Sequence, residues 1–124
     1  MKIGCSTILY GGHDLTLALD RIAAAGYSAV ELCAISNMAP HLQLAQDAAY
    51  YAAIKASVAE RGLEIESIGG SGNFGDPDRF LQALDAAAAV GAPMITTGAG
   101  GKSDDEASYA EVIKKLNALT RDAA

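Results

Sequence analysis

Hydrophobic and polar positions along this chain form blocks that switch between a helical period and a strand-like run. Three times a helical run ends in a glycine and is followed at once by a short apolar stretch. A glycine just past a helix can adopt the left-handed cap conformation, and the apolar or β-branched residues after it are typical of a strand. Residues 24–32, 60–68 and 89–97 are therefore predicted to be helix-to-strand junctions.

The same pattern predicts four strand–helix units. Strands are expected at residues 2–7, 27–32, 63–68 and 92–97. Helices are expected from Asp14 to Ala25, from about Asp47 to Arg61, from Pro77 with Asp76 as N-cap, and from Ser103, which has capping-box spacing to Glu106, to Leu119. This alternation implies a parallel sheet, because each helix must carry the chain back over one face. Four units are half of an eight-unit barrel, although the pattern alone also allows a doubly wound sheet.

The predicted connections differ in length at the two ends of the strands. The strand-to-helix connections are long and polar or glycine-rich, at residues 9–13, 36–46, 69–76 and 98–104, whereas each helix-to-strand joint is expected to be one or two residues long. Ligands of βα proteins bind at the carboxyl ends of the strands, where the long connections gather. We therefore expect a ligand site at that end.

Composition narrows the class of protein. The chain has 124 residues, of which 51% are hydrophobic, and a formal charge of -6. We expect one domain over residues 1–124, and no nucleic-acid partner, because the nine basic residues are scattered. No apolar run approaches the roughly 18 residues of a membrane span, and the N-terminus lacks the pattern of a signal peptide. We therefore expect a cytoplasmic protein without a membrane partner.

Two cysteines occur near matching points of the first two predicted strands. Cys5 and Cys33 could lie close in space, but their spacing forms no metal-ligand motif. A nucleophilic cysteine would need a base, and the sequence places neither His13 nor His41 beside one. Small buried thiols in a reducing compartment are therefore expected.

Two glycine-rich segments imitate phosphate-binding motifs. Residues 70–75 match G-x-G-x-x-G, but the predicted helix starts after these glycines, so its N-terminus would not meet a pyrophosphate. Residues 98–103 resemble the end of a P-loop, but three acidic residues follow Ser103 directly and would repel a triphosphate. Nucleotide binding is therefore not expected.

Glu31 is the polar residue with the most informative position. It lies between Val30 and Leu32 near the end of a predicted strand, so its side chain should point to the face opposite theirs. In a barrel this face is either the interior or the helix layer, and burial of a carboxylate in the helix layer is costly. We favour the interior, where Glu31 could act on a ligand or serve as an internal hydrogen-bond or ion-pair partner. Glu66 has a similar position on the third strand.

Three segments in this order, residues 3–7, 26–32 and 91–100, resemble the sugar phosphate isomerase/epimerase group of xylose isomerase-like TIM barrels. The resemblance covers nearly the whole chain but only about the first half of the family domain. It implies an α/β fold, a parallel (βα)4 unit that is half of a TIM (β/α)8 barrel and lacks the C-terminal half. It also implies polyol, ketose or related hydroxy-carbonyl substrates. Family members commonly bind a divalent metal, Mn²⁺ or Mg²⁺, that polarises substrate oxygens while carboxylates move a proton between adjacent carbons.

The resemblance also implies site residues. The family's usual metal ligands, a Glu, Asp, His and Glu set, lie on later strands, so no metal ligand is expected in this chain. Glu31 carries over as a strand-end residue, and the further substrate-binding candidates are Ser6, His41, Gly69 and Thr97. Thr97 occupies the fourth strand end, where many relatives have a histidine. His41 is either a surface loop residue or a substrate contact.

Two functions follow as expectations. The first is a sugar (phosphate) isomerase or epimerase that acts on a polyol or ketose by metal-assisted proton transfer and is incomplete as this chain. Its first and fourth strands would be open edges, which the missing C-terminal half or a second copy in a homodimer could cover. The alternative is a non-catalytic small α/β module that binds a polyol or a partner protein. No catalytic residue follows from the sequence.

Overall fold

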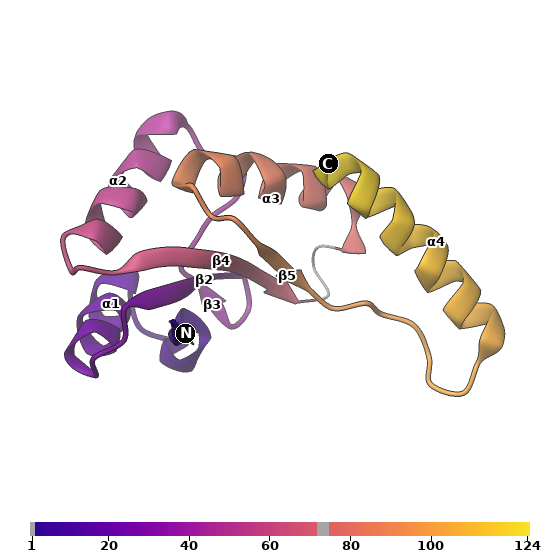
Figure 1. Cartoon of the computed structure of the whole chain (residues 1–124), viewed down its shortest axis with the longest axis horizontal. Coiled ribbons are helices and arrows are strands. Elements are labelled where there is room, and N and C mark those ends of the chain that lie inside the picture. The colour runs from indigo at the N-terminus through magenta and orange to yellow at the C-terminus, as the bar shows by residue number, and fades with distance from the viewer. Residues whose placement is uncertain (1, 72–74) are drawn as a thin grey trace.

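A parallel sheet with helices packed against it forms the centre of the computed structural model, which describes residues 2–71 and 75–124 (Figure 1). The elements are β1 Gly4–Ser6, the 3-10 helix η1 Thr7–Tyr10, α1 Leu15–Ala24, β2 Ala29–Ile35, β3 Ala39–Pro40, α2 Ala48–Ala59, β4 Glu64–Ser71, α3 Pro77–Val90, β5 Ile95–Thr97 and α4 Glu106–Ala123. The strand order is β1-β2-β4-β5 with parallel pairing throughout. The short β3 pairs antiparallel with the end of β2. The predicted α/β fold with four parallel strands and alternating helices is confirmed.

Acidic N-caps start the helices, mostly where the sequence predicts them. The side chains of Asp14, Asp47 and Asp76 accept hydrogen bonds from backbone N–H groups in the first turns of α1, α2 and α3. The predicted capping box of α4 is wrong, because Asp105 is its N-cap and accepts the N–H of Ser108. Asp104 has φ 62°, so the chain turns between Ser103 and the helix.

The helix-to-strand joints contain the predicted left-handed glycines, with φ of 86° at Gly26, 70° at Gly62 and 78° at Gly91. The joints are longer than the predicted one or two residues and span residues 25–28, 60–63 and 91–94. Each helix ends in a hydrogen-bonded turn, as where the N–H of Tyr27 donates to the carbonyl of Ile22. This turn takes up residues beyond the glycine before the strand can begin.

The hydrophobic core lies on one face of the sheet. Val30 and Leu32 of β2 are fully buried there with Ile68 of β4. The same cluster contains residues of all four long helices: Leu19, Ile22, Tyr51, Val58, Phe80, Ala83, Ala86, Ala87, Val90 and Leu119. The alternate residues of β2 point to the opposite face, which none of the four α-helices of the described part covers; there Ile8 of η1 packs against Cys33 and Ile35.

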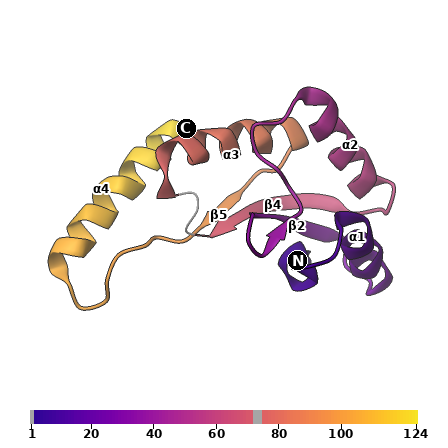
Figure 2. The same ribbon diagram turned by 180° about the vertical axis from the view of Figure 1, so that it is seen from behind.

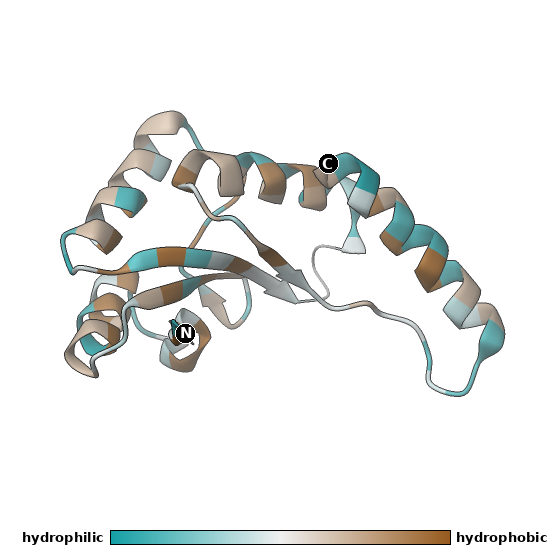
Figure 3. Cartoon of the chain, viewed as in Figure 1, coloured by the Kyte–Doolittle hydropathy of each residue, from teal (hydrophilic) through white to brown (hydrophobic). Residues whose placement is uncertain are grey.

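α4 is the helix that packs least. Its C-terminal end lies beside α3, whereas its N-terminal end extends away from the sheet in both views (Figures 1 and 2). Leu119 is its buried residue, whereas Tyr109 and Ile113 are 49% and 60% exposed. Figure 3 shows that apolar and hydrophilic residues alternate along this helix.

The glycine-rich motif at residues 70–75 is partly outside the described part of the chain, which leaves out residues 72–74. The helix α3 begins at Pro77, after these glycines, as the sequence predicts. Within the described residues, no helix is both long and apolar enough to cross a membrane.

Candidate functional site

The Glu31 carboxylate lies on the face of the sheet that the helices leave open. Its neighbours Val30 and Leu32 point into the helix-side core, so Glu31 points away from that core and is half-buried. The hydroxyl groups of Ser67 and Thr96 donate hydrogen bonds to its Oε2 at 3.1 and 2.8 Å. The side chains of β2, β4 and β5 thus form one polar row across the sheet.

Gly69 makes room for this carboxylate. Gly69 pairs with Cys33 of β2 and with Thr96 of β5 in the register of the sheet. A Cβ at residue 69 would lie 2.9 Å from both Cδ and Oε1 of Glu31. The carboxylate therefore rests on bare backbone, and any larger residue at position 69 would displace it.

Ser6 belongs to the same row but has a local partner. It pairs with Glu31 in the register of β1 and β2, so both residues face the same side of the sheet. Its hydroxyl accepts a hydrogen bond from the N–H of Ile8 at 3.4 Å and caps η1. Ser6 thus ends β1 and starts the turn beside the polar row.

His41 is buried and ties two loops together. It is 5% exposed, and its Nε2 contacts the carbonyl oxygen of His13 at 2.9 Å, which requires the proton on Nε2. Its Nδ1 is buried without a hydrogen-bond partner in the described part of the chain. The surface-loop interpretation of His41 is therefore wrong, because the antiparallel pairing of β3 with β2 draws the loop into the structure.

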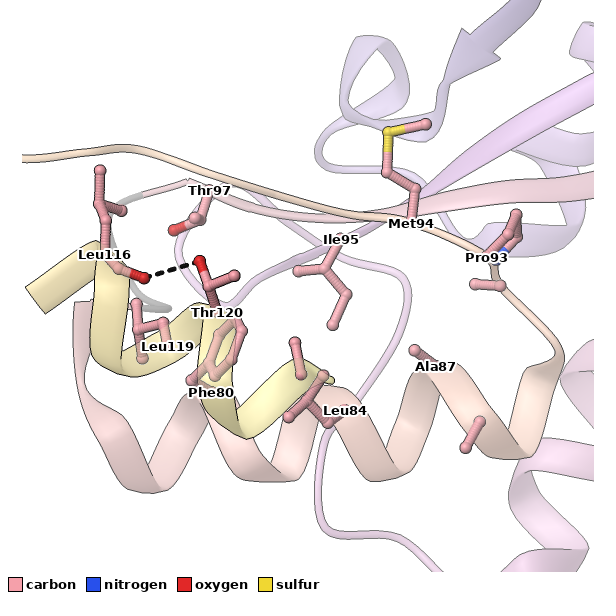
Figure 4. Close-up of a pocket in the computed structure, with 13 residues that line it drawn as sticks. Phe80, Leu84, Ala87, Pro93, Met94, Ile95, Thr97, Leu116, Leu119 and Thr120 are labelled. Carbon is pink, nitrogen blue, oxygen red and sulfur yellow. Dashed lines mark hydrogen bonds between the residues drawn. The ribbon is translucent and has the colours of Figure 1, made fainter.

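Thr97 points to the helix side of the sheet. Its hydroxyl donates to the carbonyl oxygen of Ser71 at 2.9 Å, and its side chain lines a pocket formed by β5, α3 and α4 (Figure 4). The residue of β5 that reaches Glu31 is Thr96. The sequence candidates Glu31, Ser6 and Gly69 are thus brought together, whereas Thr97 lies on the other face.

Ser67 and Thr96 are contacts of Glu31 that the sequence interpretation missed. Strand alternation alone could have placed Thr96 on the face opposite Ile95. The position of Ser67 depends on a register shift between Val30 and Glu31, which sets Ser67 and not Glu66 beside Glu31. Such a bulge leaves no composition signal in this strand, so the pairing could not be read from the sequence.

The pocket of Figure 4 has a volume of about 480 Å³ and lies apart from the polar row. Phe80, Leu84 and Ile95 give it an apolar wall. Among its hydroxyls, Thr97 donates to Ser71, and Thr120 donates to the carbonyl of Leu116 at 2.8 Å. None of the described residues that line it is charged, so these residues offer no acid, base or metal ligand.

The described residues do not fit a divalent metal. Over residues 2–71 and 75–124, no three His, Cys, Asp or Glu side chains come together to hold an ion. The neighbours of Glu31 in the polar row are hydroxyls, and one carboxylate with two hydroxyls is a poor set for Mn²⁺ or Mg²⁺. What the row can do is accept and donate hydrogen bonds around one negative charge.

Cys5 and Cys33 are free and buried on opposite faces of the sheet. Cys5 belongs to the helix-side core, whereas Cys33 packs with Ile35 and Ala39 on the face of Glu31. The expected burial is confirmed, but the idea that the thiols are close neighbours is wrong, because Cys5 pairs with Val30 and points the other way. Burial raises the pKa of both thiols. For Cys33 a hydrogen bond with the Ile35 backbone lowers the pKa by a smaller amount, and the charge of Glu31 raises it by less still.

The fold and the site define a class of protein: a parallel βα half-barrel whose strands carry polar side chains on the uncovered face. The family model described as xylose isomerase-like TIM barrel matches residues 19–124, and the chain belongs to this family. No curated protein matches the sequence.

Solved structures of two sugar epimerases resemble the chain. A D-psicose 3-epimerase crystallised in the presence of D-fructose has a TM-score of 0.73 at 17% identity. The D-psicose 3-epimerase of Clostridium cellulolyticum H10 with D-tagatose has a TM-score of 0.72 at 14% identity. The match covers 99% of this chain but 48% of each epimerase, so the chain spans about half their length. At these identities the likeness establishes the fold alone.

Replacing Gly69 by alanine tests whether the Glu31 carboxylate packs against the backbone of Gly69. We expect G69A to destabilise the fold by about 1–3 kcal/mol, since the added Cβ overlaps Glu31. The loss should shrink in G69A/E31A, giving a coupling of at least about 0.5 kcal/mol in urea denaturation of the four proteins. Strictly additive losses would show that Glu31 does not rest on Gly69.

The pKa of the Cys33 thiol tests on which face of the sheet Glu31 lies. In single-cysteine variants, E31Q should lower the pKa of Cys33 and leave that of Cys5 unchanged, since Glu31 acts on Cys33 alone. Ultraviolet absorbance of the thiolate against pH measures both. Because the folded-state pKa is raised, the thiols' contribution to stability is complete below the ordinary thiol pKa and is lost as pH rises above it. An equal response of both thiols to E31Q would contradict the placement.

Proposed function

We propose that this chain is the first half of a sugar isomerase/epimerase-like barrel, in which residues 1–124 form one half-barrel domain and bind a polyol or ketose. Membership of the xylose isomerase-like family and the likeness to two D-psicose 3-epimerases support this proposal. One of these epimerases was crystallised in the presence of D-fructose and the other with D-tagatose, and both sugars are ketoses. Because the chain spans half of these relatives, the remaining half would come from a C-terminal half-barrel or a second copy.

The observation that carries the proposal is the Glu31 carboxylate on the open face. A carboxylate accepts hydrogen bonds from sugar hydroxyls, and bonds to a charged acceptor are stronger than neutral ones. The hydroxyls of Ser67 and Thr96 occupy Oε2, which fixes the orientation of the group. Oε1 lies against Gly69 and accepts no hydrogen bond within the described residues.

Each site residue then has a proposed role. Glu31 accepts the substrate hydroxyls, and Gly69 gives it room. Ser6 flanks the same row, and His41 positions the loop that follows β2 through its contact with His13. Thr97 supports the end of β4 from the helix side.

The remaining chemistry is assigned outside this chain. Isomerases and epimerases of this kind move a proton between a carbon and a base, and a divalent metal, Mn²⁺ or Mg²⁺, polarises the substrate oxygens when bound. The described residues do not fit that metal, so its ligands would belong to the second half of the barrel. Two free cysteines are in keeping with a reducing, cytoplasmic compartment.

A non-catalytic binding module is the second candidate. The specific observation in its favour is that Glu31 already accepts two hydrogen bonds within the chain. In that case the polar row serves to hold β2, β4 and β5 together, and the chain binds a polyol or a partner protein without chemistry. The two candidates differ in whether the open face binds a ketose through Glu31.

Titration of the ¹⁵N-labelled chain with D-fructose and D-tagatose tests the proposal. We expect amide shifts at Cys33, Gly69 and Thr96, around the carboxylate. E31Q keeps the shape of the side chain but removes its charge, so the affinity should fall roughly tenfold, or about 1.4 kcal/mol.

E60Q is the matched control, because Glu60 is an exposed acid at the end of α2, away from the open face. It should bind both ketoses as the unchanged chain does. Equal binding by the wild-type chain and E31Q, or shifts confined to other surfaces, would contradict the role of Glu31.

A further inference from the structure

The 3-10 helix η1 borders the polar row on the side of β1. Its residue Ile8 packs against Cys33 and Ile35, which lie on the face of Glu31. Cys33 pairs with Gly69, and the Glu31 carboxylate rests against Gly69. Ile8 is half-buried, so part of its side chain stays accessible beside the row. η1 therefore forms an apolar border of the open face next to the carboxylate.

A threonine side chain continues the pairing with β2 where β1 stops. The pairing of the two strands ends at Ser6 and Glu31, because the chain then turns into η1. The N–H of Cys33, two residues after Glu31, donates instead to Oγ1 of Thr7 at 2.9 Å. Thr7 is fully buried and Cys33 is 1% exposed, so water does not reach this hydrogen bond. The side-chain oxygen of Thr7 thus takes the place of a strand carbonyl.

The far end of η1 is held by the loop that follows β2. A Cβ on Gly11 would lie 2.7 Å from the carbonyl oxygen of Met38, so the two backbones are in contact. Nε2 of His41 donates to the carbonyl oxygen of His13, just beyond η1. Both contacts reach the backbone after η1, whereas the start of η1 is joined to β2 through the side chain of Thr7. Thr7 is thus a position where one side-chain change can release η1 from β2.

We propose that Thr7 is a positioning residue of the ligand site, whose side-chain oxygen joins η1 to β2 and so fixes the apolar border beside Glu31. Thr7 is fully buried, so it acts through Cys33 and η1 and not by contact with a ligand. Loss of the oxygen leaves the Cys33 N–H buried without a partner, which favours separation of η1 from β2. A border that is no longer fixed costs affinity, because binding must then order it. The link to ketose binding rests on the proposed function, whereas the hydrogen bond that fixes η1 does not.

T7V and T7S test which part of the threonine matters. T7V keeps the shape of the side chain but removes the oxygen, whereas T7S keeps the oxygen and removes the methyl group. In hydrogen exchange of the ¹⁵N-labelled chain, T7V should speed exchange of the Cys33 amide at least about tenfold relative to the amide of Val30 in the same strand. T7S should leave this ratio unchanged.

The ketose titration tests the link to the site. T7V should bind D-fructose and D-tagatose at least about threefold more weakly than the wild-type chain, and T7S should restore the affinity. T120V is the matched control, because it removes the same kind of hydroxyl from an exposed residue of α4, away from the open face. It should change neither the exchange of Cys33 nor the affinity for ketose.

Far-UV circular dichroism checks the folding of each variant. If T7V unfolds, nuclear Overhauser effects in the wild-type chain decide, since the Cys33 amide proton should lie close to the β proton of Thr7 and the Ile8 methyls close to the Cys33 β protons. Absence of these effects, unchanged Cys33 exchange in folded T7V, or equal acceleration in T7S would overturn the inference. So would ketose affinity that T7V leaves unchanged.

Failure of this inference and failure of the proposed function are distinguishable. If no ketose binds the wild-type chain, the proposed function fails and the role of Thr7 in ligand binding fails with it. The exchange of the Cys33 amide then still decides whether Thr7 fixes η1. If the wild-type chain binds a ketose and T7V binds it equally well, the proposed function stands and the positioning role of Thr7 is wrong.

Discussion

All four long helices of this chain pack against one face of a parallel sheet, and the rest of the structure depends on that asymmetry. The helix-side core gathers Val30, Leu32 and Ile68 with residues of α1, α2, α3 and α4. Strand alternation then forces the remaining side chains of β2 and β4 onto the opposite face, which in the described part carries η1 over Cys33 and Ile35 but no α-helix. A parallel sheet is normally covered on both faces, so a sheet open on one face is half of a larger arrangement. Family membership identifies that arrangement as a βα barrel.

The polar row on the open face forms because Gly69 has no side chain and so leaves space for the side chain of Glu31. Glu31 projects from β2 toward β4, where Gly69 leaves the space that its carboxylate occupies. Ser67 and Thr96 then fix the orientation of the carboxylate from two strands. Because the partners are hydroxyls and not cations, the row keeps its negative charge. Glu31 lies within β2, which extends to Ile35, and not at the strand end that the sequence predicts. Under the proposed function its charge accepts hydrogen bonds from sugar hydroxyls.

Much of the fold could be predicted from the sequence because its signals are local. The N-caps Asp14, Asp47 and Asp76 and the left-handed glycines of the three joints are each specified within one turn of chain. The orientation of Glu31 also followed from its two apolar neighbours. The cap of α4 was misassigned to Ser103, because two acidic residues compete for the position and backbone geometry decides between them.

The contacts of the site depend on pairings between distant strands, which the sequence did not specify. Thr96 and Thr97 lie on opposite faces, which alternation from Ile95 could have indicated, but the contact of Thr96 with Glu31 also needs the register of β5 against β4. Ser67 reaches Glu31 through a register shift, and His41 is buried through the pairing of β3 with β2. Neither pairing has a signature in composition or periodicity. The strand β3 has two residues, Ala39 and Pro40, which is too short for an alternating pattern to be seen in the sequence.

The position of Glu31 on the open face is the central claim, and nuclear Overhauser effects from its side-chain methylene protons test it most directly. The account predicts strong effects to the α protons of Gly69 and to the side chain of Thr96. Effects to the helix-side residues Val58 or Phe80 would contradict it, because they would place the carboxylate in the layer between sheet and helices.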